Sequence, residues 1–376
     1  MIIAAGRVLA AEADLAPGHL LIEGDRIIAL GEGIPPGADR IFPDGVIVPG
    51  FVDLQVNGGA GVDLLDCRVA DLARLSAYLA STGTTGYLAT LITAAPHRTH
   101  AALTVLSGAG AEGAERLGVH LEGPVLNPAR RGAHEARWLR RADDPEVLGL
   151  FGEALPHLRL VTLAPELPGS DALIEWLGDK GVVVALGHTE ATYEEALRAF
   201  ARGARMATHL FNGMRAFHHR DPGLVGAALD DGSCVCGLIA DGVHVHPAAV
   251  RMAFRLLGPD RIALVTDAAG AAGMPPGRYT AGDQPVEVGA DGMPRLADGT
   301  LAGSVLRMDE AVSNLARWGI PLRDAARSAS ATPTRLLGLA DRGVLAPGYR
   351  ADVAVLGEDG RTRLTLVAGR PAYDRP

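Results

Sequence analysis

Short apolar runs separated by amphipathic segments recur along most of this chain. Within each run the residues are almost continuously apolar, with little polar alternation. Such runs are typical of parallel strands that are buried on both faces. The eight runs cover residues 45–56, 84–93, 116–123, 158–166, 182–188, 204–211, 235–242 and 261–268.

The segment between the fifth and sixth runs shows what connects them. Residues 189–203 place Thr192 and Glu195 at the spacing of a capping box, which predicts the start of a helix. Eight strand–helix units predict an α/β fold, a (β/α)₈ TIM-like barrel spanning residues 49–342. A doubly wound open sheet is the alternative.

The two ends of the chain follow a different pattern. Residues 1–10 and 20–33 read as short strands, the second interrupted by a Gly24–Asp25 turn, and residues 351–373 read as two more strands. Neither end has enough strands to bury a sheet alone. We therefore predict one small β-sandwich domain formed from both termini, residues 1–48 plus 343–376, with the stretch after residue 342 as the return linker.

Charge limits the partners. The chain of 376 residues carries a net charge of −9, which argues against nucleic acid and anionic membranes as partners. An anionic small substrate would need local basic residues. Lys180 is the only lysine, so a P-loop lysine is absent and only one residue could form a Schiff base.

Cysteine usage and hydropathy indicate the compartment. Three cysteines do not make a disulfide framework, so we expect a reducing, cytoplasmic setting. Cys234 and Cys236 could form a metal pair, but two buried strand residues are the favoured interpretation. The N-terminus has no cationic region typical of a signal peptide, and no apolar run approaches the ~18 residues of a membrane span.

Ionisable residues stand where the predicted strands end. Catalytic sites of such barrels are built at the carboxyl ends of the strands. Any one of these residues alone would more often be structural, but their shared level indicates one site. They are Glu122, His188, His209, Asp241, His244 and Asp267.

Two kinds of chemistry follow from this set. One Glu and two His are a plausible ligand set for a Zn²⁺-like ion that keeps a position open for water. Asp267, at the end of the eighth run, could then take a proton from that water and deliver it to a leaving amine. Hydrolysis is the indicated reaction, and helix capping by Asp267 is the structural alternative.

At these residues the chain resembles the amidohydrolase superfamily and, within it, the N-acetylglucosamine-6-phosphate deacetylase family. The resemblance covers nearly the whole length. It includes "VPGFVDLQVNG", "HLEGPVLNPARRGAH", "ALGHTEATYEEA", "THLFNGMRAFHHRDPG", "IADGVHVHP", "LVTDA" and "LAGS". The resemblance implies metal-dependent hydrolysis of N-acetylglucosamine 6-phosphate to glucosamine 6-phosphate and acetate, by a metal-activated water.

The resemblance also implies residue roles. Glu122, His188 and His209 match the family's metal ligands, Asp267 its acid/base, and His134 the catalytic histidine that contacts the substrate carbonyl. Residues matching the substrate contacts are Asn212, Gly213, Arg220, His244, Leu301, Ala302 and Gly303, with Arg220 and His244 around the phosphate. The family commonly forms homodimers, in which the His218–Arg220 loop would lie near the partner's active site.

One departure affects the metal count. Many amidohydrolases carry His-x-His after the first barrel strand, where this chain has Gln55 and Asn57. Neutral amides are poor ligands for a Zn²⁺-like ion, so we expect one divalent ion per subunit and supporting contacts from these two amides. Zn²⁺ is the expected ion, with Fe²⁺, Co²⁺ and Mn²⁺ as alternatives.

Three alternatives remain open, and a fourth is set aside. N-acetylgalactosamine 6-phosphate could be the substrate, or another amidohydrolase reaction on a cyclic or acyclic amide could take place. The scaffold could also have lost catalysis. Residues 108–113 match a dinucleotide-binding G-x-G-x-x-G, but they follow a helix-like segment and lead into a strand, so a loop is favoured.

Overall fold

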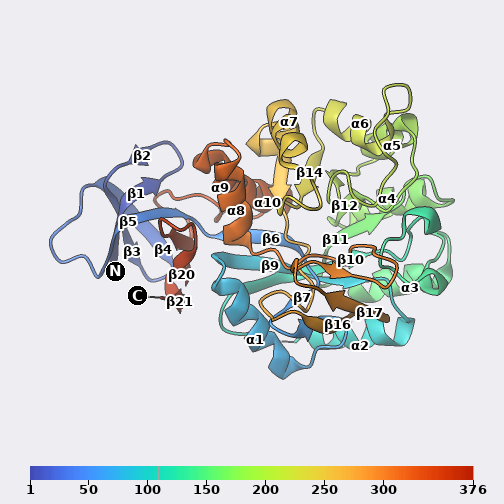
Figure 1. The fold of residues 1–376 in the computed structure, drawn as a ribbon, viewed down its shortest axis with the longest axis horizontal. Helices are drawn as coiled ribbons and strands as arrows, with labels where there is room; N and C mark the ends of the chain where they lie inside the picture. Colours follow the sequence, from blue (N-terminus) through green and yellow to red (C-terminus); the bar gives the residue numbers. More distant parts are fainter. Residues whose placement is uncertain (109, 376) are drawn as a thin grey trace.

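A computed structural model describes residues 1–108 and 110–375 of the chain. Its larger part is a ring of eight parallel strands surrounded by helices (Figure 1). The barrel strands, in spatial order, are β6 (Phe51–Val56), β9 (Thr84–Ile92), β10 (Glu115–Glu122), β11 (Leu158–Leu163), β12 (Val183–Leu186), β13 (Met206–Ala207), β14 (Val235–Leu238) and β15 (Ile262–Leu264). The predicted barrel is confirmed.

The ring closes at a narrow seam. β6 and β15 share no ladder, and a single parallel bridge between Val56 and Ala268 joins their ends. The backbone N–H groups of Asn57 and Gly58 both donate to the Ala268 carbonyl, at 2.8 and 2.9 Å. The first and last strands therefore meet where the polar strand-end residues gather.

Helices fill the connections between strands. They are α1 (Val69–Ala80), α2 (Pro96–Leu106), α3 (Pro145–Ala154), α4 (Ser170–Asp179), α5 (Tyr193–Ala201), α6 (Gly223–Asp230), α7 (Pro247–Leu257), α8 (Met308–Arg317), α9 (Leu322–Ala329) and α10 (Ala331–Leu336). The predicted capping box of α5 is present, because Thr192 and Glu195 each accept the other's backbone N–H. Among the described residues, no helix is long and apolar enough to cross a membrane.

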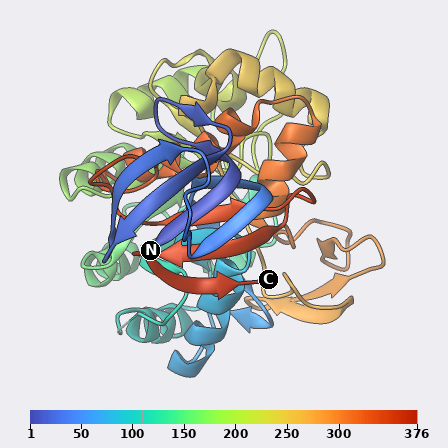
Figure 2. The same ribbon diagram turned by 90° about the vertical axis from the view of Figure 1, so that its left-hand side faces the viewer.

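A second sheet is built from both ends of the chain. Figure 2 shows the strands of the N-terminal end (blue) and of the C-terminal end (red) lying together. The order is β21 (Arg370–Asp374), β20 (Thr362–Val367), β19 (Val353–Leu356), β5 (Arg40–Pro49), β1 (Ile2–Leu9), β3 (Gly18–Glu23), β4 (Arg26–Glu32), with β2 (Asp14–Leu15) beside β1. This confirms the predicted terminal β domain, in one continuous sheet with its own apolar core.

The structure differs from the sequence prediction in three places. The first apolar run divides at Gly50, so that residues 46–49 pair in the terminal sheet while β6 begins the barrel. A side chain at Gly50 would collide with Thr85, whose Cγ2 lies 2.2 Å from the place of a Cβ. The sixth run holds only two strand residues, because the chain turns at His209 and Phe211 into the left-handed region.

The third difference is an additional small sheet after β15. It consists of β16 (Gly277–Ala281), β17 (Gln284–Val288) and β18 (Pro294–Arg295). A further short pair, β7 (Gly58–Gly59) and β8 (Val62–Asp63), follows β6. Both insertions lie at the carboxyl ends of barrel strands, where they add walls to the pocket described next.

Candidate active site

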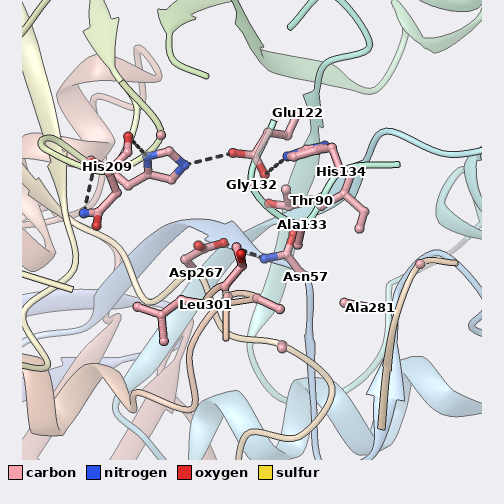
Figure 3. A pocket seen from close by; sticks show the side chains of 18 of the residues that line it. Asn57, Thr90, Glu122, Gly132, Ala133, His134, His209, Asp267, Ala281 and Leu301 are labelled. Carbon is pink, nitrogen blue, oxygen red and sulfur yellow. Dashed lines mark hydrogen bonds and ion pairs between the residues drawn. The ribbon is translucent and has the colours of Figure 1, made fainter. Parts of the chain in front are cut away.

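A cavity of about 250 Å³ opens at the carboxyl ends of the barrel strands. Figure 3 shows Glu122 between His209 and His134, with Asp267 and Asn57 opposite them. Glu122 is the last residue of β10, and His188, His209 and Asp267 each follow the end of a strand within three residues. The sequence prediction that these residues share one level of the barrel is confirmed.

Three atoms converge at the floor of the pocket. His209 Nε2 lies 3.2 Å from Glu122 Oε1 and 3.1 Å from His188 Nε2, and His188 Nε2 lies 3.2 Å from Glu122 Oε1. A tetrahedral zinc ion with bonds of about 2.0–2.1 Å would separate its ligands by roughly 3.3 Å. The triangle therefore has the size that such a cation requires.

Backbone carbonyls fix the orientation of both imidazole rings. The carbonyl of Arg130 lies 2.7 Å from His188 Nδ1, and that of Asn212 lies 3.1 Å from His209 Nδ1. A carbonyl can only accept, so the proton of each neutral ring belongs on Nδ1. The lone pair of each Nε2 then points towards Glu122, as in histidines that bind metals.

His134 has the opposite arrangement. The backbone N–H of Thr93 donates to His134 Nδ1 at 3.2 Å, which places the proton of the neutral ring on Nε2. Burial lowers the pKa of His134 to about 3, so the ring is uncharged. Glu122, His134 and His188 also form a group that could hold a cation, but His134 Nε2 lies 3.7 Å from Glu122 Oε2 and carries a hydrogen.

Charge within the cluster favours a bound cation. Burial alone would raise the pKa of Glu122. The rings of His188 and His209 donate a hydrogen bond to its carboxylate when they are protonated on Nε2, and this holds the pKa of Glu122 well below its usual range. Burial opposes a charged His209, yet its hydrogen bond with Glu122 raises the pKa of the ring. A proton on His209 and a metal cation would therefore compete for the same three atoms.

Asp267 is held separately from this triangle. Asn57 Nδ2 donates to Asp267 Oδ1 at 2.6 Å, and Gln55 Nε2 donates to Glu122 Oε1 at 3.0 Å. Burial, followed by the charge of Glu122, raises the pKa of Asp267 to about 6. The two amides that replace His-x-His thus make the supporting contacts expected of them, one to each carboxylate.

Backbone strain is concentrated at the same residues. His188, His209 and Asp267 adopt φ values of +48°, +29° and +51°. Residues other than glycine rarely occupy this region, and such outliers cluster at functional sites. Gly213, at φ +60°, lies so close that an added Cβ would stand 3.0 Å from the His188 ring and 3.3 Å from that of His209. This loop can therefore approach both imidazoles only with glycine there.

The remaining predicted substrate contacts divide into two groups. Those that line the pocket are His134, Asn212, Gly213, His244, Leu301, Ala302 and Gly303. Arg220 is not among the lining residues of its own chain; it is exposed, with its guanidinium 3.0 Å from His219 Nε2. The structure therefore brings together every predicted metal, catalytic and substrate-contact residue except Arg220, while Asp241 lies behind His244 and does not line the pocket itself.

Sequence reasoning missed part of the pocket wall. Thr280, Ala281 and Gly282, at the turn between β16 and β17, line the cavity together with Asp63. The N–H of Gly282 donates to Asp63 Oδ2 at 3.1 Å, which ties the turn to β8. The alternation of polar Arg278 and Thr280 with the less polar Tyr279 and Ala281 was the signal for a strand that the sequence offered.

The rival interpretations can be located in the structure. Lys180, the one residue that could form a Schiff base, is the C-cap residue of α4 and lies outside the pocket lining, so it is not placed to react with a substrate there. In the G-x-G-x-x-G segment, Ala109 is outside the described residues, and the rest forms part of the connection between α2 and β10. A Rossmann turn needs a strand before it and a helix after it, which is the reverse order.

Comparison with known proteins identifies the group to which this site belongs. The model of the amidohydrolase family matches residues 46–372. An N-acetylglucosamine-6-phosphate deacetylase of Vibrio furnissii is 39% identical over 333 residues, which cover 87% of this chain and 83% of that protein. An N-acetylgalactosamine-6-phosphate deacetylase of Escherichia coli O157:H7 is 40% identical over 343 residues, 90% of each protein.

Solved structures agree over the full length. An Asp-to-Ala mutant of N-acetyl-D-glucosamine-6-phosphate deacetylase from Mycobacterium smegmatis, in complex with N-acetyl-D-glucosamine 6-phosphate, superposes with a TM-score of 0.92 at 38% identity, covering 99% of both chains. The structure of the N-acetylglucosamine-6-phosphate deacetylase from Thermotoga maritima superposes with a TM-score of 0.89 at 32% identity, covering 100% of both chains. The chain belongs to the amidohydrolase family, and its hydrolase relatives act as deacetylases of amino-sugar 6-phosphates.

Proposed function

We propose that this chain hydrolyses N-acetylglucosamine 6-phosphate to glucosamine 6-phosphate and acetate. The observation that carries the proposal is the convergence of Glu122 Oε1, His188 Nε2 and His209 Nε2 beside an independently held carboxylate, Asp267. Relatives that are about 40% identical and bear this activity support it.

Glu122, His188 and His209 would hold one divalent cation. The donor set suits Zn²⁺, and Fe²⁺, Co²⁺ or Mn²⁺ would also accept one carboxylate and two imidazoles. When bound, such an ion lowers the pKa of a water ligand and polarises the amide carbonyl. His134 is left out of the ligand set because its Nε2 carries a hydrogen.

Asp267 and His134 have complementary tasks in this scheme. Asn57 occupies Oδ1 of Asp267, which leaves Oδ2 to accept a proton from the attacking water and to return it to the departing amine nitrogen. His134 Nε2–H is the donor available to the acetyl oxygen as negative charge develops on it. Each residue thus acts on a different atom of the amide.

Recognition of the phosphate requires more positive charge than the pocket of a single chain provides. Among the described residues that line the pocket there is no Arg or Lys, although a phosphate dianion calls for positive charge. His244 supplies one imidazole. We infer that Arg220 and its neighbours His218 and His219 enter the pocket of a second copy, in a homodimer. The planar guanidinium of Arg220 suits phosphate oxygens.

N-acetylgalactosamine 6-phosphate is the second candidate substrate. The Escherichia coli relative that carries this name covers 90% of this chain at 40% identity. The two sugars differ only in the configuration of one hydroxyl, so the same catalytic atoms would serve both. A cytoplasmic location is also part of the proposal, supported by three buried cysteines that are free thiols.

Acetate release by metal-reconstituted protein tests the proposal. We would compare N-acetylglucosamine 6-phosphate, N-acetylgalactosamine 6-phosphate and unphosphorylated N-acetylglucosamine. A strong preference for the first is the expected result. Preference for the second would reassign the substrate, and equal rates with the unphosphorylated sugar would remove the phosphate from the proposal. Absence of acetate from all three, with metal bound, would contradict deacetylation.

A further inference from the structure

A buried carboxylate–imidazole pair lies at the pocket wall, apart from the metal triangle. His244 Nδ1 is 2.6 Å from Asp241 Oδ2, and both side chains are nearly inaccessible, at 6% and 5% exposure. Val243, between them, is 50% exposed, so the pair lies just beneath the surface. Because Asp241 engages Nδ1, the remaining ring nitrogen of His244, Nε2, is the one left for the pocket that His244 lines.

Asp241 is fully occupied by this turn. Its Oδ1 accepts the backbone N–H groups of Val243 and His244, both at 2.8 Å, while within the described part of the chain Oδ2 accepts from the ring alone. One oxygen therefore shapes the backbone and the other acts on the imidazole. Hydrogen bonding to His244 counters the cost of burial and keeps the pKa of Asp241 below its usual range.

The pocket is otherwise poor in groups that could balance the charge of a phosphate, and this makes the pair of Asp241 and His244 important. The described lining includes the carboxyl groups of Asp63, Glu122 and Asp267 and no Arg or Lys. His188 and His209 are committed to the triangle, and His134 is neutral. His244 is thus the one side chain of the described lining whose ring nitrogen contacts a carboxylate that is not part of the triangle.

We propose that Asp241 is a positioning residue for phosphate recognition: it holds His244 as an imidazolium whose Nε2–H faces the sugar phosphate. This inference rests on the proposed function and extends it, because it assigns discrimination between phosphorylated and unphosphorylated sugars to a residue that does not touch the substrate. With Nδ1–H donated to Asp241, a neutral His244 would present only a lone pair to the phosphate. The charged ring presents a donor.

Asp241→Asn separates charge from shape. The Asn oxygen can keep both backbone N–H bonds, while its amide N–H would face His244 Nδ1 and favour a neutral ring with Nε2–H. The turn and one donor survive, and the positive charge is lost. A charge-assisted hydrogen bond contributes about twice as much as a neutral one, so we expect KM for the phosphorylated sugar to rise about 10-fold.

The experiment compares kcat and KM of wild type and Asp241→Asn on N-acetylglucosamine 6-phosphate and N-acetylglucosamine, with inorganic phosphate as a competitive inhibitor. The expected result is a KM and a phosphate inhibition constant both raised about 10-fold, with kcat and the unphosphorylated reaction changed less than about 3-fold. In a His244→Gln background, Asp241→Asn should have no further effect, because residues that act through one another are not additive.

Asp231→Asn is the matched control. Asp231 accepts the backbone N–H groups of Ser233 and Cys234 in the same kind of turn before β14, away from the pocket. The Asp231→Asn substitution should leave KM for the phosphorylated sugar unchanged. Asp241→Ser, which can still accept from the turn, is the second variant if Asp241→Asn does not fold.

Four results would overturn the inference. Wild-type KM in Asp241→Asn, or KM raised equally for both sugars, would show that Asp241 has only a structural part while the deacetylase assignment stands. Additive effects with His244→Gln would show that Asp241 acts by another route. A wild-type protein that releases no acetate from the phosphorylated sugar would overturn both the inference and the proposed function.

Discussion

The two ends of the pocket differ in how completely one chain builds them. At the metal triangle, each reactive atom has a partner from the same chain: two backbone carbonyls orient His188 and His209, and two amides hold Glu122 and Asp267. At the end proposed to hold the phosphate, His244 is held by Asp241, and Arg220 lies outside the pocket lining. Hydrolysis and phosphate recognition should therefore fail separately when residues of one end are changed.

The largest effect is expected at the triangle. Glu122→Gln removes the negative ligand while it keeps the shape of the side chain. We expect bound metal to fall below about a tenth of the wild-type content and activity to fall by about 10⁴-fold or more, because the Lewis acid is lost. Metal analysis of the purified variant, beside acetate release, measures both.

Glu115→Gln is its matched control. Glu115 begins the strand that Glu122 ends, and it pairs with Arg342 and Arg350 far from the pocket. It should keep metal and turnover. Full metal content in Glu122→Gln would show that the carboxylate is not a ligand. The assignment of metal binding to the triangle end of the pocket would then be wrong.

Asp267→Asn should separate catalysis from metal binding at the same end. The substitution keeps the size of the side chain but removes a base that can accept and return a proton. We expect kcat to fall about 10²–10⁴-fold, the usual range for general acid–base catalysis, with metal content and KM nearly unchanged. Loss of metal in proportion to loss of activity would instead make Asp267 a ligand.

Arg220→Ala tests the incomplete end. Loss of a bidentate guanidinium contact should raise KM for the phosphorylated sugar about 10–100-fold while kcat changes little. Arg202→Ala, which changes an arginine just after α5 that pairs with Asp171 and Glu175, is the control and should have no effect.

Mixing variants shows which copy uses Arg220. In a heterodimer of Arg220→Ala and Asp267→Asn, the first chain keeps its acid/base and would receive Arg220 from the second. Dissociation and reassociation of the two proteins should restore a low-KM activity that neither has alone. If heterodimers form and this activity is not restored, Arg220 acts in the pocket of its own chain. Both ends of the pocket would then be built by one chain.

The smallest effect concerns the barrel interior beneath the catalytic end. Asp53 Oδ2 accepts the hydroxyl of Thr266 at 2.6 Å, and burial raises the pKa of Asp53 to about 7. A folded-state pKa above the unfolded value of ~3.9 means that stability is fully present below that value and is lost as pH rises through 7. The free energy of unfolding should fall by about 1.4 kcal/mol per pH unit in that window.

Asp53→Asn should abolish this contribution, since its amide does not titrate. Urea unfolding at pH 5, 6, 7 and 8 measures this. The free energy of unfolding of the variant should increase relative to that of the wild type up to about pH 7, and the difference should stay constant above it. Thr266→Val is the companion variant and should extend the loss to higher pH, because it removes a hydrogen bond that favours the carboxylate. Parallel curves for wild type and Asp53→Asn throughout would show that Asp53 is ionised at every pH tested.

The sequence predicted the fold where the burial pattern was unambiguous. Continuous apolar runs identified the strands of the barrel, and the capping box of Thr192 and Glu195 fixed the start of α5. The motifs located Glu122, His188, His209 and Asp267 in advance because strand ends meet at one face of a barrel. Each of these signals involves residues that are close together in the sequence, so one sequence is enough to recognise it.

Other features depend on contacts that the sequence does not display. The positive φ of His209 shortened a predicted strand, and nothing in "MATHL" marks it. The β16–β17 turn reaches the pocket only because Asp63, far away in sequence, accepts the N–H of Gly282. The position of Arg220 outside its own pocket is a property of tertiary structure, since motif reasoning gives a residue a role without giving it a location.

The seam of the barrel carries one more consequence. Asn57 and Asp267, which are 210 residues apart, are joined by a hydrogen bond beside the single bridge that links the first strand to the last. While this seam is open, Asn57 cannot hold Asp267, the proposed acid/base, in its place. Under the proposed function, turnover would therefore begin only when the barrel closes, and in a refolding experiment the appearance of activity would report this non-local step.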